Sequence, residues 1–500
     1  MASVSDKQSA PRLQIALRIL ALVLLFSGSA VYESIHLSAL NAPEVSVHLR
    51  TGTWMLESRA IPRTALFSQY PNLPWNDSSW GFDFLLGVAY RIFGLRAIPL
   101  LSMVLKVALG VVTFLLARSG RAGFWQAVGL SALGQYVLSG LQPLPYVFSI
   151  VFFAIELQLL FRSRHAGSLH GLYWLPALFL VWANLHIQFV VGLVLLAVFV
   201  IALVIEHWLR TIGVPWLNPR ILPLSLKQVS AISGLSLLAT FITPYGFRVL
   251  ADFLKASYSQ AAFEHFSEMS AMSFRRPQDY LLMLLVMMAF LVLGRRRSLE
   301  LFELFVLLAA TGVAFRIQRD GWLVVLSAIA VLSTASFVNS PEKQSSGMRP
   351  ASKWGVVAAA TAIVLVIAAF RVPDRNALMN RVSENFPVKA CNYIRENKLP
   401  APLFHEYSFG SFLTWYMPEY PVVVDSRVEL YGDKLLTEYF DVIGGKERLD
   451  SHPMVDRAGT LLLERNSAMA KALRNLPALS SQYRLVYSDE RANVFVPQNH

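Results

Sequence analysis

Long apolar segments recur along the chain up to about residue 370. Each comes close to the roughly 20 residues that an α-helix needs to cross a hydrocarbon layer of about 30 Å. The run 172–206 is too long for one span and has Asn184 and His186 in its middle, so it predicts a hairpin of two helices. The pattern therefore predicts eleven membrane-spanning helices, from apolar runs at 15–32, 97–117, 123–141, 146–161, 172–206, 228–243, 279–293, 300–315, 321–337 and 354–370.

Basic residues between these runs indicate the orientation. With eleven spans and the N-terminus inside, every loop on the cytoplasmic side carries arginine or lysine, as the positive-inside bias requires. The short apolar stretch 81–94 contains Asp83 and Arg91, and counting it as a twelfth span would move several basic clusters outside. We therefore predict that 81–94 lies at the outer interface or re-enters the membrane. The inside clusters are Arg118/Arg121, Arg162/Arg164, Arg210/Arg220/Lys227, Arg295–Arg297 and Lys343/Arg349/Lys353.

The composition changes after residue 370. Charges are sparse within 14–370 and common in 371–500, which predicts a transmembrane domain over 1–370 and a soluble, extracytoplasmic α/β domain over 371–500. Strands are predicted at 403–404, 421–425, 459–464, 484–487 and 492–496, and helices at 387–396, 408–415 and 434–439.

Overall composition agrees with a membrane protein. Only 15% of residues are charged and 55% are hydrophobic, whereas soluble domains carry about 25% charged residues. The net charge of +12 follows from the basic loops, so nucleic acid is not an expected partner. The single cysteine, Cys391, allows no intrachain disulfide and is interpreted as structural.

Polar residues without an obvious structural role gather in four segments that this topology places outside. The segments are the first outer loop 33–96, the turn 184–188, the loop 244–278 and the junction 316–320. Ionisable and polar groups at one side of a membrane bundle are typical of an active site.

The first outer loop carries the most informative motif. It contains Ala42-Pro-Glu44-Val-Ser46-Val47-His48-Leu-Arg50-Thr-Gly52-Thr-Trp54, then Ile61-Pro62, Phe67-Ser68, Pro74-Trp75 and Trp80. This loop resembles that of the GT-C glycosyltransferases, more narrowly the bacterial relatives of the protein O-mannosyltransferases. Their usual pattern is Asp-x-Asp-x-Trp-Trp-His-Leu-x-x-Gly-x-Trp, then Ile-Pro-x-x-Asp-x-Phe-Ser and Pro-Trp-x-x-x-Glu-Trp.

Further motifs follow in the order of that family. The resemblance therefore covers nearly the whole chain, and it implies a polytopic enzyme that moves a sugar from a polyprenyl-phosphate donor. The matching segments are Trp182-Ala-Asn184-Leu-His186, Thr243-Pro-Tyr-Gly246 with Glu268 further on, Arg319-Asp320-Gly-Trp322, Ser408-Phe-Gly410-Ser-Phe-Leu-Thr-Trp415, and Val424-Asp425-Ser-Arg427 followed by Tyr431-Gly432.

Some positions depart from the family pattern. Ala42, Ala65 and Ser79 stand where acidic residues are usual, and Ser46 and Val47 replace two tryptophans. Glu44 keeps a carboxylate where the family has its catalytic aspartate. Because glutamate is one methylene longer, a base there is displaced by about 1 Å, which can cost about a hundredfold in rate.

The resemblance implies a role for each matching polar residue. Glu44 is the candidate general base for an acceptor hydroxyl. His48, Asn184, His186 and Glu268 are candidates for substrate binding. The two histidines could hold sugar, phosphate or a divalent cation, or could satisfy backbone carbonyls, so a divalent cation stays open and no fixed metal site is predicted.

Cations near the outer end of a span match the needs of a lipid phosphate leaving group. Arg316 and Arg319 could hold that phosphate by bidentate contact, or could extend to the interface as ordinary flanking arginines. Asp320 is also a candidate for substrate binding, and the simpler interpretation is that it orients Arg319 or caps the next helix. Asp425 and Arg427 are expected to form a structural pair.

The leading hypothesis is a multi-pass glycosyltransferase of the bacterial cytoplasmic membrane, acting at the outer face on membrane lipid with an unidentified acceptor. A first alternative is a catalytically degenerate relative that binds glycolipid or a partner protein, as the missing acidic residues suggest. A second is a transporter, which predicts internal repeats and charges deep in the membrane. Only Lys106, Glu156 and Glu303 are such charges, and no repeat is visible.

Overall fold

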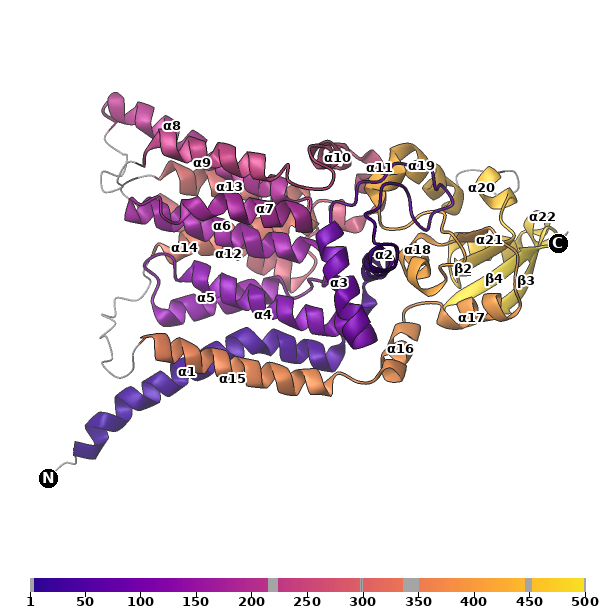
Figure 1. Ribbon diagram of the computed structural model, residues 1–500, viewed down its shortest axis with the longest axis horizontal. Coiled ribbons are helices and arrows are strands. Elements are labelled where there is room, and N and C mark those ends of the chain that lie inside the picture. The colour runs from indigo at the N-terminus through magenta and orange to yellow at the C-terminus, as the bar shows by residue number, and fades with distance from the viewer. Residues whose placement is uncertain are drawn as a thin grey trace. The chain divides into compact units, whose positions relative to one another are not determined.

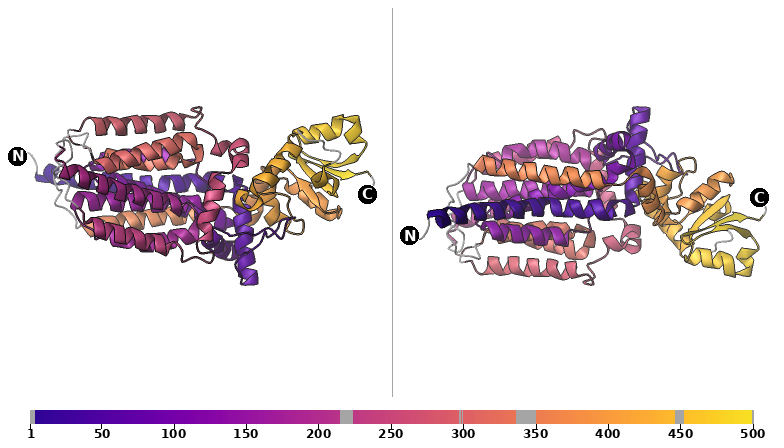
Figure 2. Two further views of the ribbon diagram at one scale, coloured as in Figure 1. Left: turned by 90° about the horizontal axis from the view of Figure 1, so that it is seen from above. Right: turned by 90° about the horizontal axis from the view of Figure 1, so that it is seen from below.

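The computed structural model describes residues 4–214, 224–296, 298, 300–335, 350–445 and 452–498. Arg220, Arg297, Lys343 and Arg349 of the basic clusters lie outside these residues. The chain forms two compact units, shown in Figures 1 and 2. We call them the helical unit (Met1–His36, Leu100–Gly246 and Glu268–Val372) and the mixed unit (Leu37–Pro99, Phe247–Ser267 and Pro373–His500).

Long apolar helices dominate the helical unit. Within the described residues, six candidate spans are long and apolar enough to cross a membrane, so this is a multi-pass membrane protein. They include α1 (Val4–His36), α4 (Ala97–Ala117), α6 (Tyr146–Ala166), α8 (Phe189–Thr211), α12 (Pro277–Gly294) and α15 (Pro350–Arg371).

Five further predicted spans are helical but shorter. The hairpin predicted in 172–206 is confirmed, because α7 ends at Leu185 and His186 takes an extended conformation before α8 begins. The total of eleven spans stays a prediction, since five of these helices have only 11 to 16 residues. They are α5 (Phe124–Val137), α7 (Leu175–Leu185), α9 (Leu226–Ala239), α13 (Leu301–Arg316) and α14 (Trp322–Ser333). Short 3-10 helices in this unit are η3 (Leu172–Trp174) and η5 (Gln318–Gly321), while η4 (Ser267–Met269) starts at its boundary.

Helix α14 forms the centre of the helical unit. All twelve of its residues are buried, and it contacts α5, α6, α12 and α13. A helix that is apolar on every side belongs in the interior of a bundle. Its neighbours surround α14, so it does not need the length of a helix that faces lipid.

A four-stranded mixed sheet lies in the mixed unit. The strand order is β1-β2-β4-β3, with β1 parallel to β2 and the remaining pairs antiparallel. Alternate side chains such as Phe404, Leu461 and Phe495 face a core shared with Tyr439. The strands are β1 (Leu403–His405), β2 (Thr460–Glu464), β3 (Tyr483–Ser488) and β4 (Ala492–Pro497).

Helices complete the mixed unit. Those predicted at 387–396, 408–415 and 434–439 are confirmed as α17 (Val388–Glu396), α18 (Tyr407–Tyr416) and α19 (Val428–Ile443). The others are α2 (Glu44–Ser58), α3 (Trp80–Phe93), α10 (Arg248–Ser257), α11 (Gln260–His265), α16 (Arg375–Ser383), α20 (Pro453–Asp456), α21 (Ala468–Asn475), α22 (Pro477–Ser480), η1 (Ser38–Asn41) and η2 (Gly94–Arg96).

The strand predicted at 421–425 is wrong. These residues are mostly buried, as their apolar sequence requires, but they do not join the four-stranded sheet. Val422 instead forms an isolated bridge with Ser68 of the first outer loop. The Val423 N–H donates to the His405 imidazole, so a side chain replaces a neighbouring strand as its partner.

Helices α2 and α3 cross at two glycines. A Cβ atom on Gly52 would lie 1.9 Å from the Asp83 carbonyl oxygen, and one on Gly87 would lie 2.5 Å from the Gly52 carbonyl carbon. No side chain other than hydrogen fits such an approach. The crossing holds the Asp83 side chain of α3 next to α2.

Candidate functional site

A histidine and a buried aspartate meet where α2 crosses α3. The imidazole Nδ1 of His48 donates to Asp83 Oδ1 at 2.7 Å, and the Asp83 side chain is only 1% exposed. Phe82 packs edge-on against the imidazole, with ring centroids 5.3 Å apart. Because Nδ1 carries the proton that is donated to Asp83, Nε2 of His48 carries a lone pair that can accept a proton. The His48 side chain is 21% exposed.

A second buried carboxylate, Asp77, lies close to this pair. Its Oδ1 accepts the Ser79 backbone N–H at 3.0 Å, while its Oδ2 has no hydrogen-bond partner among the described residues. Burial and then the negative charge of Asp83 raise the pKa of Asp77 well above its usual value. Asp77 therefore tends to hold a proton at a pH where exposed aspartates have lost theirs.

Two glutamates add further negative charge near His48. Glu44 is the first residue of α2, one turn before His48, where the helix dipole favours an acidic side chain. The charges of Asp77, Glu429 and Glu44 raise the pKa of His48, but burial outweighs them and the net shift is downward. A neutral imidazole is the form that can accept a proton. We call Glu44, His48, Asp77, Asp83 and Glu429 the His48 cluster.

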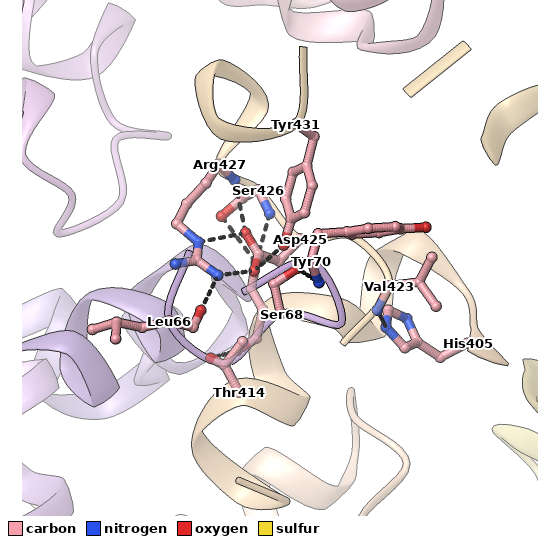
Figure 3. A network of polar contacts seen from close by, with 11 residues as sticks. Leu66, Ser68, Tyr70, His405, Thr414, Val423, Asp425, Ser426, Arg427 and Tyr431 are labelled. Atoms are coloured by element: carbon pink, nitrogen blue, oxygen red, sulfur yellow. Dashed lines mark hydrogen bonds and ion pairs between the residues drawn. The ribbon is translucent and has the colours of Figure 1, made fainter. Parts of the chain in front are cut away.

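Asp425 and Arg427 of the same unit form a different kind of polar group (Figure 3). Arg427 donates to both Asp425 oxygens, at 2.9 and 2.6 Å, and the Tyr431 hydroxyl donates to Asp425 at 2.8 Å. Arg427 also donates to the Leu66 carbonyl, and its guanidinium lies over the Trp75 ring. Despite burial, the Arg427 charge and these donors lower the pKa of Asp425. The pair ties the first outer loop to the segment before α19.

The helical unit contains a cavity of about 1020 Å³. Parts of α1, α4, α5 and α12, the segment 138–147 and η5 surround it. Most of its walls are apolar, whereas Arg276 and Arg319 bring positive charge to one part of its lining. The cavity thus offers an apolar volume together with cationic donors.

The charges beside the cavity are loosely paired. Arg319 Nη1 lies 3.7 Å from Glu268 Oε1, with both side chains well exposed at 37% and 61%. Arg276 donates to Asp279 at 2.9 Å, and Lys106, on the cavity wall, reaches the buried Glu33 at 2.5 Å. An exposed pair such as Arg319–Glu268 contributes about 0–1 kcal/mol, so Arg319 can exchange Glu268 for a stronger anion at little cost.

Other predicted residues of the helical unit have hydrogen-bond partners within it. His186 Nδ1 is hydrogen-bonded to Ser149 Oγ at 2.8 Å, and the same hydroxyl accepts from the Trp182 indole at 2.7 Å. Asn184 donates to the carbonyls of Leu180 and Ile242. These contacts fix the turn between α7 and α8.

The structure brings some predicted site residues together. Glu268 and Arg319 share the cavity lining, and Asp320 accepts from Gln188 at 2.9 Å while lying 3.9 Å from Arg319. Arg316 is the last residue of α13. Glu44 and His48 lie in the mixed unit, so a single site that also includes His186, Glu268 and Arg319 stays a prediction.

The overall fold is shared with known proteins. The apo oligosaccharyltransferase of Archaeoglobus fulgidus superposes with a TM-score of 0.53 at 12% identity, over 96% of this chain and 75% of that one. The fold of this chain therefore resembles that of an oligosaccharyltransferase. The oligosaccharyltransferase AglB of Archaeoglobus fulgidus, in complex with an inhibitory peptide and a dolichol-phosphate, gives a TM-score of 0.52 at 12% identity, over 93% of this chain and 72% of that one.

A third structure has a lower TM-score. ArnT of Cupriavidus metallidurans bound to undecaprenyl phosphate gives a TM-score of 0.49 at 14% identity, over 96% of this chain and 97% of that one. No family model matches the sequence. No curated protein matches it significantly either. The oligosaccharyltransferase comparisons show a shared fold, while membership in the GT-C superfamily and in its O-mannosyltransferase-like subfamily stays a prediction.

Three members of the His48 cluster, Asp77, Asp83 and Glu429, are not among the site residues predicted from the sequence. The sequence pattern presents Asp83 only as a charge that argues against a span at 81–94. The proximity of Asp83 and Glu429 to His48 depends on the glycine crossing and on the C-terminal segment. The pair Gly52 and Gly87 was the one available signal, but nothing in the sequence shows that the two glycines touch.

Proposed function

We propose that this protein transfers a sugar from a polyprenyl-phosphate donor to an acceptor at the outer face of a bacterial cytoplasmic membrane. The observation that carries the proposal is the apolar cavity with Arg319 in its lining. An isoprenoid chain needs an apolar volume, and its phosphate needs cationic donors. The oligosaccharyltransferase of similar fold was solved with a dolichol-phosphate, which is a lipid of this class.

Arg319 is proposed to bind the donor phosphate. Its exposed contact with Glu268 leaves guanidinium donors that can form two parallel bonds to phosphate oxygens. The bond between the anomeric carbon and the phosphate oxygen breaks during transfer, and the departing lipid phosphate takes the electron pair. A fixed cation at that oxygen stabilises the charge as it develops.

Glu44 is proposed to accept the proton of the acceptor hydroxyl as its oxygen attacks the anomeric carbon. His48, one turn further along α2, is a second group that can take a proton, because Asp83 holds its Nδ1–H. In this proposal the C-terminal domain is extracytoplasmic, and the protein is similar to the bacterial O-mannosyltransferase relatives. The sugar and the acceptor are not specified by these contacts.

A binding experiment tests the proposal without knowledge of the sugar. Native mass spectrometry of the purified protein with undecaprenyl phosphate should show one bound lipid. Arg319→Gln should weaken binding about 10- to 100-fold, because a hydrogen bond to a charged group contributes about 1.5–3 kcal/mol. Arg162→Gln, an exposed arginine of α6 outside the cavity, is the matched control. Equal binding by all three proteins would contradict the proposal.

A second candidate is a relative that binds glycolipid without turnover. Ala42 and Ala65 stand where the family pattern has acidic residues, and both are buried, at 5% and 2% exposure. Ala65 belongs to the apolar core of the mixed unit, so a carboxylate there would be buried among apolar groups at high cost. Lipid binding with no release of undecaprenyl phosphate from any donor would favour this candidate.

A further inference from the structure

A histidine and two glutamates converge in the helical unit, away from the cavity. Ligand atoms of His165, Glu300 and Glu303 all lie within 4.8 Å of one another. His165 is near the end of α6, whereas Tyr146 at the start of α6 lines the cavity. At about 1.5 Å per residue, these two positions are roughly 28 Å apart along the helix. The cluster is therefore separate from the site proposed for the lipid phosphate.

The tautomer of His165 suits a metal ligand. Its Nδ1 lies 2.7 Å from the Phe161 carbonyl oxygen, one turn earlier in α6, and that oxygen can only accept. The proton therefore sits on Nδ1, and the lone pair of Nε2 is available. Metal-binding histidines usually have this arrangement, in which one ring N–H donates to a carbonyl and the other nitrogen binds the ion.

Glu303 contributes a buried oxygen without a partner. Its side chain is 2% exposed, and Oε2 accepts from Arg296 Nη1 at 2.7 Å. Its Oε1 has no hydrogen-bond partner among the described residues. Arg296 is also held by the Thr334 hydroxyl, so its guanidinium is fixed on one side of the carboxylate. A buried carboxylate oxygen left without a donor is costly unless a cation or a proton occupies its other side.

Glu300 brings a second buried carboxylate to the same place. The residue is 7% exposed and stands at the N-cap of α13, but its side chain does not cap the helix. Glu300 and Glu303 thus bring two carboxyl groups within reach of the His165 imidazole, and Arg296 is bonded to one of them. One imidazole nitrogen with two carboxylates is a ligand set that Zn²⁺ and Mn²⁺ accept.

We propose that His165, Glu300 and Glu303 bind a divalent transition-metal ion of the Zn²⁺ or Mn²⁺ class. His165 Nε2 and the two carboxylates are the protein ligands, and water completes the coordination on the exposed side of His165. Arg296 holds Glu303 from the second shell. The ion joins the end of α6 to the start of α13, two helices that are far apart in the sequence.

Manganese binding tests this site with a signal that does not depend on enzymatic activity. Full-length protein in detergent is stripped with EDTA, desalted and titrated with MnCl₂, and free Mn²⁺ is followed by electron paramagnetic resonance. One saturable site is expected, from which ZnCl₂ displaces the manganese. His165→Asn and Glu303→Gln should each weaken binding at least about tenfold, the lower end of what loss of a ligand's support costs.

Controls separate loss of the site from loss of the fold. His165 is exposed, so His165→Asn should keep the elution profile and melting behaviour of the metal-free wild type. His170→Asn, an exposed histidine outside the cluster, should bind Mn²⁺ like the wild type. Wild-type protein without saturable Mn²⁺ binding would overturn the proposal, as would a well-folded His165→Asn variant with unchanged affinity.

Discussion

Two buried aspartates of the mixed unit have opposite surroundings. Both Asp425 oxygens accept bonds from Arg427, and Tyr431 donates as well. Asp77 has one backbone donor on Oδ1 and no partner for Oδ2, with Asp83 as its acidic neighbour. The pKa is lowered at Asp425 and raised at Asp77.

This difference indicates that the Asp425–Arg427 pair stabilises the fold, whereas the His48 cluster is suited to catalysis or binding. In the Asp425–Arg427 pair both carboxylate oxygens have charged donors, and Arg427 Nη1 is the one guanidinium nitrogen without a hydrogen-bond partner among the described residues. A carboxylate bound in this way has no free oxygen to offer a substrate. In the His48 cluster, carboxylates outnumber cations, and the buried Oδ2 of Asp77 has no hydrogen-bond partner among the described residues. Groups with strongly shifted pKa values and unused bonding capacity are typical of functional sites.

Glu44→Gln should have the largest effect on activity. The change keeps the size of the side chain and removes its charge, and loss of a positioned general base costs about 10²- to 10⁴-fold in rate. Release of undecaprenyl phosphate from a sugar-loaded donor is the measurement. Glu57→Gln, an exposed glutamate later in α2, should leave the rate unchanged. Wild-type turnover by Glu44→Gln would remove Glu44 from the mechanism.

Arg427→Met should have the largest effect on stability. It leaves the Asp425 carboxylate buried without its cation, which costs about 3–5 kcal/mol. Thermal unfolding in detergent, followed by intrinsic fluorescence, should show a lower melting temperature. Arg395→Gln removes an exposed pair with Glu419, about 44% and 43% exposed, and should cost about 1 kcal/mol or less. Similar losses in both variants would show that Arg427 contributes no more to stability than an exposed ion pair does.

His405 makes the stability of the mixed unit depend on pH. Burial lowers its pKa from 6.5 to about 4, and the neutral ring already accepts the Val423 N–H (Figure 3). The unfolded chain therefore binds the proton more readily, so stability is complete above pH 6.5 and is lost as the pH falls toward 4. A pKa shift of this size corresponds to a change of about 3 kcal/mol in the free energy of unfolding.

The neighbouring Glu406 acts in the opposite direction. Burial raises its pKa to about 7, so its folded form holds a proton and its contribution is lost as the pH rises from 4.5 through 7. His405→Gln should therefore remove the loss of stability that the wild type shows below pH 6.5. The Glu406 contribution then remains, so the variant should become more stable as the pH falls from 7 to 5. Denaturation midpoints at several pH values provide the measurement. Parallel pH profiles for wild type and variant would refute the assignment to His405.

Asp77→Asn should have the smallest effect on stability. Asp77 already tends to be protonated, because burial and Asp83 raise its pKa, so an amide of equal size changes little in the folded state. The expected change is within about 1 kcal/mol, in contrast to the loss expected for Arg427→Met. A melting temperature as low as that of Arg427→Met would show that Asp77 is a charged structural group.

The sequence predicted helices and strands well where periodicity and length decide them. The break at His186 and all four sheet strands follow from apolar runs and polar interruptions. The segment 421–425 has the composition of a strand, but its partners are Ser68 and the His405 side chain, which no local pattern reveals. Five helices are shorter than a membrane span. For α14 the reason is that neighbouring helices enclose it on every side.

The candidate site could be predicted only in part. Glu44, His48 and Arg319 were identified from motifs, and Arg319 does line a cavity. Asp83 was missed because a carboxylate inside an apolar run looks like an obstacle to a span, and its role depends on a contact with His48 across two helices. Such pairings come from tertiary structure, and the motif order does not contain them.

Sugar transfer by the proposed mechanism releases a polyprenyl phosphate, and this product can be measured directly. Purified wild-type protein is incubated with a set of undecaprenyl-phosphate monosaccharides and a cell-envelope fraction as the source of acceptors, and free undecaprenyl phosphate is quantified by mass spectrometry. We expect time-dependent release from at least one donor, reduced about 10²-fold or more by Glu44→Gln. Absence of release from every donor, by wild-type protein that still binds undecaprenyl phosphate, would contradict the proposed mechanism.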